Sequence, residues 1–136
     1  MSNYKQSSVD EEFVPFEEAL ALKELGFDEP CFAVYFNTTQ QLYFDKYINE
    51  FNKDVRTLAP TFSQAFRWFR DTHNLIGGIQ YIGGLKSETT WWGIYVVGHF
   101  NTYIYEMSME YKPYEEAELA CLKKLIKIHG GNNEQQ

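Results

Sequence analysis

The chain is poor in the residues and runs that several kinds of site and structure require. Its two cysteines, Cys31 and Cys121, lie far apart without CxxC spacing, which fits neither a disulfide scaffold nor a structural zinc site. We therefore expect two reduced, buried thiols. No run of about 18 apolar residues is present, so no membrane-spanning helix is predicted. The first 12 residues lack the apolar core of a secretory signal, and we expect a cytoplasmic protein.

Positive charge is also scarce. The 136 residues include 12 basic and 19 acidic side chains, a net charge of -7. This acidic balance disfavours nucleic acid as a partner, because such binding depends largely on neutralising phosphates.

Sets of catalytic or metal-binding residues are missing as well. His73, His99 and His129 are dispersed and lack the helical spacing of a zinc site. Neither cysteine has a placed histidine partner, and no serine lies in a nucleophile-elbow context. We predict no catalytic residues, no metal and no cofactor, and an enzyme is the least favoured class.

The hydrophobic content, 44% with 18% aromatic residues, is sufficient for one domain with a core of its own. We assign residues 13–129 to a single domain. Residues 1–12 and 130–136 are polar with few apolar anchors, so we expect mobile termini.

The clearest helix signals lie between Ala59 and Leu75. Thr61 and Gln64 have the spacing of a capping box, and Asn74 suits the left-handed end of a helix. The pattern predicts a helix over 62–73. Phe62, Phe66 and Phe69 form its buried stripe, with Trp68 beside them, while Arg67, Arg70 and Asp71 occupy the opposite face.

Two further helices are predicted, over 15–25 with a stop at Gly26 and over 113–129. The core face of the last helix is expected to hold Tyr114, Ala117, Cys121, Leu122, Leu125 and Ile128. Alternation and β-prone composition predict strands over 31–36, 42–44, 79–82, 90–98 and 102–110, whereas 45–58 is assigned mostly to loop. The fold class is therefore α+β, with an antiparallel sheet of about five strands, three helices on one face and the order αββ-αβββ-α.

Three segments resemble a known group of sequences: FVPFEEALALKELGFDEPCF, APTFSQAFRWFRDTHNL and YEEAELACLKKLI. They are similar to a family of small uncharacterised proteins from tailed phages and mobile elements of gut Bacteroidetes-type bacteria. The resemblance implies a viral or mobile-element protein in a bacterial host cytoplasm. It implies no activity and no catalytic residues.

The segment from Trp91 to Tyr111 is rich in aromatic residues, and two interpretations stay open. The strands are buried on both faces, or an exposed sheet face binds a partner. The candidate interaction surface consists of Trp91, Trp92, Tyr95, Tyr103 and Tyr105.

The leading functional hypothesis is a non-enzymatic interaction protein that binds a host or phage protein, or a second copy as a homodimer, through an aromatic or acidic surface. The alternative is a small-ligand or nucleotide-sequestering protein, in which Arg67, Arg70 or Lys86 contacts an anion.

Overall fold

The computed structural model describes residues 7–44, 52–82, 91–98, 103–106 and 113–130. The chain divides into two compact units, Met1–Ala65 and Phe66–Gln136, and each is described by itself. The assignment of 13–129 to one domain stays a prediction. Of the termini that we expected to be mobile, residues 1–6 and 131–136 lie outside the described residues, whereas Ser7–Asp10 forms a short helix, α1.

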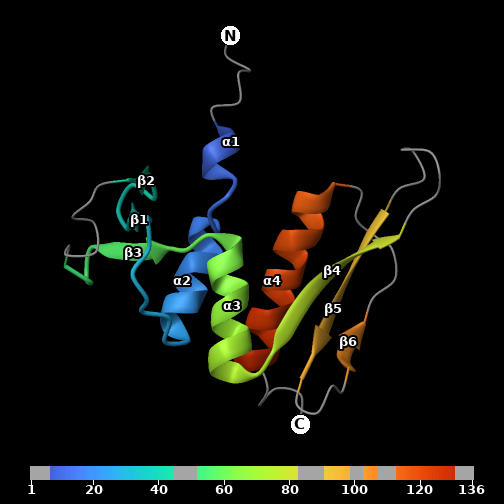
Figure 1. The fold of residues 1–136 in the computed structure, drawn as a ribbon. Coiled ribbons are helices and arrows are strands. Elements are labelled where there is room, and N and C mark those ends of the chain that lie inside the picture. Colours follow the sequence, from blue (N-terminus) through green and yellow to red (C-terminus); the bar gives the residue numbers. More distant parts are fainter. Residues whose placement is uncertain (1–6, 45–51, 83–90, 99–102, 107–112, 131–136) are drawn as a thin grey trace. The chain divides into compact units, whose positions relative to one another are not determined.

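The first unit contains a three-stranded antiparallel sheet. Its strands are β1 (Ala33–Phe36), β2 (Leu42–Tyr43) and β3 (Arg56–Ala59), in the order β2-β1-β3 (Figure 1). The strand β3 corrects the sequence analysis, which assigned 45–58 mostly to loop; residues 45–51 lie outside the described residues. β3 pairs with β1 along its whole length and all four of its residues are buried.

The helix α2 (Phe16–Glu24) lies within one residue of the predicted range 15–25 at each end. Pro15 precedes it, and Glu17 and Glu18 lie in its first turn, where the helix dipole favours negative charge. Gly26 takes φ = 108°, a left-handed conformation that costs glycine little. The Phe27 N–H then donates to the Leu22 carbonyl at 2.9 Å, which closes a Schellman motif.

Three residues of β1, Ala33, Val34 and Tyr35, are buried in the core of the first unit. The Tyr35 hydroxyl donates to the Val14 carbonyl at 2.8 Å, and its ring meets Phe16 edge to face. Ala33 and Val34 are fully buried. Phe32, which the alternation placed in the strand, precedes it instead and is 78% exposed.

The helix α3 (Phe62–His73) has the predicted bounds. The Gln64 N–H donates to the Thr61 hydroxyl at 3.1 Å, which is one half of the capping box. The Gln64 side-chain nitrogen donates to the Pro30 carbonyl at 2.9 Å, a contact outside the capping box. Asn74 ends the helix at φ = 58°.

The stripe of α3 is largely confirmed. Phe62 and Phe69 are buried, and Arg67 and Arg70 are exposed. Phe66 is only partly buried, whereas Trp68 belongs to the core. The apolar face is therefore wider on the Trp68 side than the spacing suggested.

The second unit contains a separate sheet in the order β4-β5-β6. Its elements are β4 (Ile76–Ile82), β5 (Trp91–Val97), β6 (Tyr103–Glu106) and the helix α4 (Tyr114–Gly130) (Figure 1). Two antiparallel sheets of three strands thus stand where one sheet of about five was expected. β3, which the sequence analysis assigned to loop, adds the third strand to the sheet of β1 and β2.

One face of the β4–β5 pair packs on α4. A Cβ atom on Gly77 would lie 2.7 Å from Leu125 Cδ1 and 2.9 Å from Cys121 Sγ, so helix and strand approach closely only because this residue is glycine. The predicted core face of α4 holds for four residues that are fully buried: Ala117, Cys121, Leu122 and Leu125. It is wrong for Tyr114, which is 39% exposed.

Across the described ranges, no helix combines the length and apolarity that crossing a bilayer requires.

Candidate functional site

The five aromatic residues of the predicted interaction surface do not share one face of the sheet. Trp92 faces α4, where it packs against the cluster of Ile94, Ala117 and Cys121. Successive strand residues point to opposite faces, so Trp91 and Tyr95 lie on the other face. Tyr103 and Tyr105 lie opposite Val97 and Val96 on β6, and their side chains lie outside the described residues.

Tyr95 is positioned by a glycine on the neighbouring strand. Gly78 is its register partner, and a Cβ atom there would overlap the Tyr95 ring. The ring therefore lies across the Gly78 backbone, and the tyrosine is half-buried. Tyr95 thus covers the position of Gly78, which has no side chain of its own.

The structure brings together three rings that the sequence analysis did not group. Tyr81 and Trp92 are register partners with ring centroids 5.3 Å apart, and Trp92 meets Tyr114 at 5.0 Å. Both contacts are edge to face, which suits the quadrupoles of the rings. We call Tyr81, Trp92 and Tyr114 the aromatic corner.

The aromatic corner is an outward-facing feature of the second unit. Tyr81 is 55% exposed and Tyr114 39%, while Trp92 between them is half-buried. Because Trp92 also contacts the core cluster under α4, the exposed rings are attached to a rigid base. The sequence alone could not pair Tyr81 with Trp92, because the register that joins them is a property of the folded sheet.

Carboxylates lie beside the corner. Partial burial, followed by the negative charges of Glu118 and Glu115, raises the pKa of Tyr114, so both carboxylates act electrostatically on this ring. We call Glu115 and Glu118 the acidic rim. Glu115 also lies in the first turn of α4, where the helix dipole stabilises it. An aromatic surface beside carboxylates offers two kinds of attraction to a cation.

The predicted anion contacts do not form a site among the described residues. Arg67 and Arg70 are exposed on α3, and Arg70 Nε lies 3.2 Å from Asp71 Oδ1 on the same helix. Lys86 lies outside the described residues. A pair of exposed charges on one helix contributes little stability.

Two histidines that are distant in the sequence meet at the ends of α3 and α4. The rings of His73 and His129 have centroids 3.9 Å apart, and Trp68 packs edge-on against His73. Burial and then the neighbouring His129 lower the pKa of His73. Burial in this contact favours the neutral form of His73.

Both thiols are free and buried, as predicted. Burial raises the pKa of Cys31 and of Cys121 to about 12, so neither has the thiolate character of a reactive cysteine. Within the described ranges, no group of three or more histidine, cysteine, aspartate or glutamate side chains could hold a metal ion.

Comparison with known proteins gives no matching family model, no matching curated protein and no matching solved structure.

Proposed function

We propose that the protein is a binding protein that captures a basic segment of another protein at the aromatic corner. The observation that carries the proposal is the geometry of three edge-to-face rings, two of them exposed, beside the carboxylates of Glu115 and Glu118. Tyrosine and tryptophan are the side chains most enriched where partner proteins bind tightly.

The chemistry of the corner favours Lys or Arg as the partner's anchoring residue. A cation over a tyrosine or tryptophan face gains about 0.5–1 kcal/mol at an exposed site. A carboxylate within reach adds an ion pair that ranges from nothing to about 1 kcal/mol in water. Each contact is weak, so a useful affinity requires a segment that engages both rings and the rim together. If the resemblance to phage-element proteins holds, that segment belongs to a phage or host protein.

Panning a random peptide display library against the purified protein tests this proposal. Selected peptides should be enriched in Lys and Arg, and their binding should weaken roughly two- to fivefold when Tyr114→Ser removes one cation–π contact. Tyr43→Ser is the matched control, because Tyr43 is 38% exposed on β2 of the first unit. Selection of peptides without basic residues, or equal losses in both variants, would overturn the proposal.

A further inference from the structure

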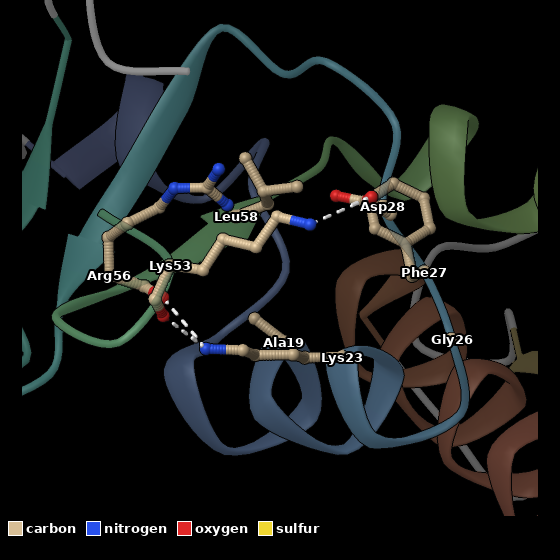
Figure 2. Close-up of a pocket in the computed structure, with 8 residues that line it drawn as sticks. All are labelled: Ala19, Lys23, Gly26, Phe27, Asp28, Lys53, Arg56 and Leu58. Atoms are coloured by element: carbon tan, nitrogen blue, oxygen red, sulfur yellow. Dashed lines mark hydrogen bonds and ion pairs between the residues drawn. The ribbon is translucent and has the colours of Figure 1, made fainter. Parts of the chain in front are cut away.

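The first unit contains a cavity that the sequence analysis did not anticipate. Its volume is about 300 Å³, at the lower end of the range for small-molecule sites. Residues of α2, of the turn that follows it, of the turn before β3 and of β3 itself line the cavity (Figure 2): Ala19, Lys23, Gly26, Phe27, Asp28, Lys53, Arg56 and Leu58.

The lining is cationic within an acidic unit. Residues 1–65 carry 11 acidic and 5 basic side chains, yet three of those basic residues, Lys23, Lys53 and Arg56, line this cavity with one carboxylate, Asp28. The lining therefore has a formal charge of +2 where the unit as a whole is negative. An anion in the cavity would therefore be attracted by three of the eight lining residues.

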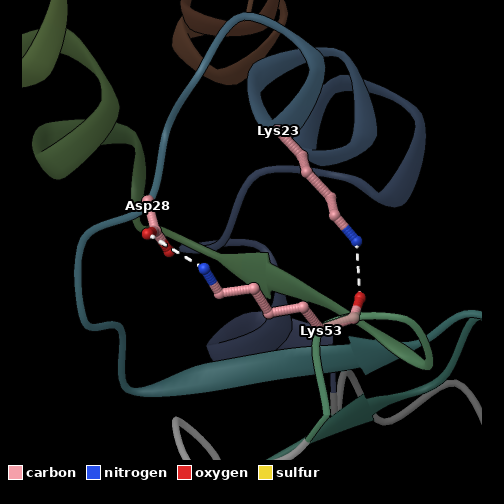
Figure 3. A network of polar contacts seen from close by, with 3 residues as sticks. All are labelled: Lys23, Asp28 and Lys53. Atoms are coloured by element: carbon pink, nitrogen blue, oxygen red, sulfur yellow. Dashed lines mark hydrogen bonds and ion pairs between the residues drawn. The ribbon is translucent and has the colours of Figure 1, made fainter.

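Lys23 fixes one wall of the cavity. Its ammonium donates to the Lys53 carbonyl at 2.8 Å and to the Arg56 carbonyl at 3.0 Å, which ties α2 to the turn before β3 (Figure 3). Asn52 holds that turn, since its side-chain oxygen accepts from the Asp54 N–H at 2.8 Å. An ammonium has three N–H donors, so the two carbonyls leave Lys23 one donor for a ligand.

Lys53 and Asp28, both on the lining of the cavity, form an ion pair. The Lys53 ammonium is 3.5 Å from the Asp28 carboxylate, and the two side chains are 69% and 62% exposed. Figure 3 shows Lys53 extended from its turn towards Asp28. An ion pair this exposed contributes little, so a stronger anion can recruit Lys53 at small cost.

Arg56 supplies the deeper charge. It is only 6% exposed, and Figure 2 shows its guanidinium beside Leu58 on the cavity wall. Charges in such a poorly hydrated position interact more strongly than at the surface. Ala19, Phe27 and Leu58 are buried and give the cavity an apolar floor.

We propose that this cavity binds a small phosphate monoester. The phosphate dianion is attracted by the cationic lining and accepts hydrogen bonds from Lys23 and Lys53, whose ammonium donors suit its several oxygens. The organic part of the ligand lies against Phe27 and Leu58. This site lies in the first unit and is independent of the aromatic corner.

Titrations followed by amide NMR test the proposal, with inorganic phosphate, AMP and adenosine as probes. Phosphate and AMP should shift the amides of residues 53–58 in a saturable way, and adenosine should not. Lys53→Gln, an exposed change, should weaken AMP binding about tenfold, the usual effect of losing a charged hydrogen bond. Asp28→Asn should leave it equal or up to about fivefold tighter, because a competing ion pair is removed.

Lys127→Gln is the matched control, because it removes one positive charge from an exposed position on α4 and should leave AMP binding unchanged. If Lys127→Gln and Lys53→Gln weaken AMP binding equally, the effect comes from the overall charge of the protein and the proposed site is refuted. Absence of saturable shifts with both phosphate and AMP would also overturn it, as would AMP binding that Lys53→Gln does not weaken.

Discussion

Replacement of Gly77 and Gly78 by alanine tests the packing of the second unit one face at a time. These neighbours point to opposite faces of β4. A Cβ atom on Gly77 would press on Leu125 and Cys121 of α4, whereas one on Gly78 would overlap the Tyr95 ring on the other face. Leu125 and Cys121 are fully buried, so neither can yield without moving the core.

Two opposing effects determine how much Gly77→Ala changes the free energy of unfolding. Overpacking a well-filled core costs about 1–3 kcal/mol. A glycine-to-alanine change also restricts the unfolded chain, which stabilises the folded protein by about 0.4–1 kcal/mol. We therefore expect the free energy of unfolding to fall by roughly 1–2 kcal/mol, measured by urea denaturation at constant m-value.

Double mutants that combine each glycine replacement with the loss of one neighbouring side chain show which contact causes the destabilisation. Leu125→Ala alone should cost about 2–5 kcal/mol because it leaves a cavity, but in that background Gly77→Ala should be nearly neutral, since its methyl group fills part of the void. Tyr95→Ala should relieve Gly78→Ala in the same way, and Leu125→Ala should not. If Gly77→Ala and Leu125→Ala simply add within about 0.5 kcal/mol, the close approach of β4 and α4 is refuted.

Three further predictions concern the helices. Phe69→Ala should lower the free energy of unfolding by about 3–5 kcal/mol, because Phe69 is fully buried; a loss below about 1 kcal/mol in urea denaturation would contradict this. Thr61→Ala should cost about 1 kcal/mol by removing the cap on Gln64, and Thr61→Ser should restore most of it; equal losses would exclude capping. The lowered pKa of His73 means that unfolding takes up a proton, so stability should fall as pH drops through and below 6.5. His129→Gln should make that fall shallower, and an unchanged pH profile would argue against the ring contact.

The helices were predictable because their signals are local. Gly26 and Asn74 adopt the left-handed conformations that end α2 and α3, and each is identified by its residue type and neighbours. Thr61 caps α3 with the expected backbone contact. What the local signals could not give was the partner of the Gln64 side chain, because Pro30 is 34 residues away along the chain.

The sheets were less predictable because strand pairing depends on distant residues. β3 has the sequence RTLA, which shows no strong alternation and contains an arginine, so loop was the natural interpretation. Pairing with β1 decides the matter, since backbone hydrogen bonds do not depend on the side chains. The prediction for Tyr114 was wrong for a similar reason. Helical spacing placed it on the core face, but it is the first residue of α4, is 39% exposed and packs edge to face with Trp92.

The net charge of -7 excludes neither proposed site, because screening makes electrostatics local. At physiological salt the Debye length is about 8 Å, so a ligand responds mainly to the few charges around its site. The acidic rim contains an exposed carboxylate at Glu115, and the Lys53 side chain at the cavity is 69% exposed. Salt screens the interactions of exposed charges. Raising the ionic strength from about 0.05 to about 0.5 M should therefore weaken both the binding of basic peptides at the aromatic corner and the binding of AMP in the cavity. With competing phosphate and sulfate kept out of the buffer, AMP binding that does not change over this range would mean that Lys53 does not contact the phosphate.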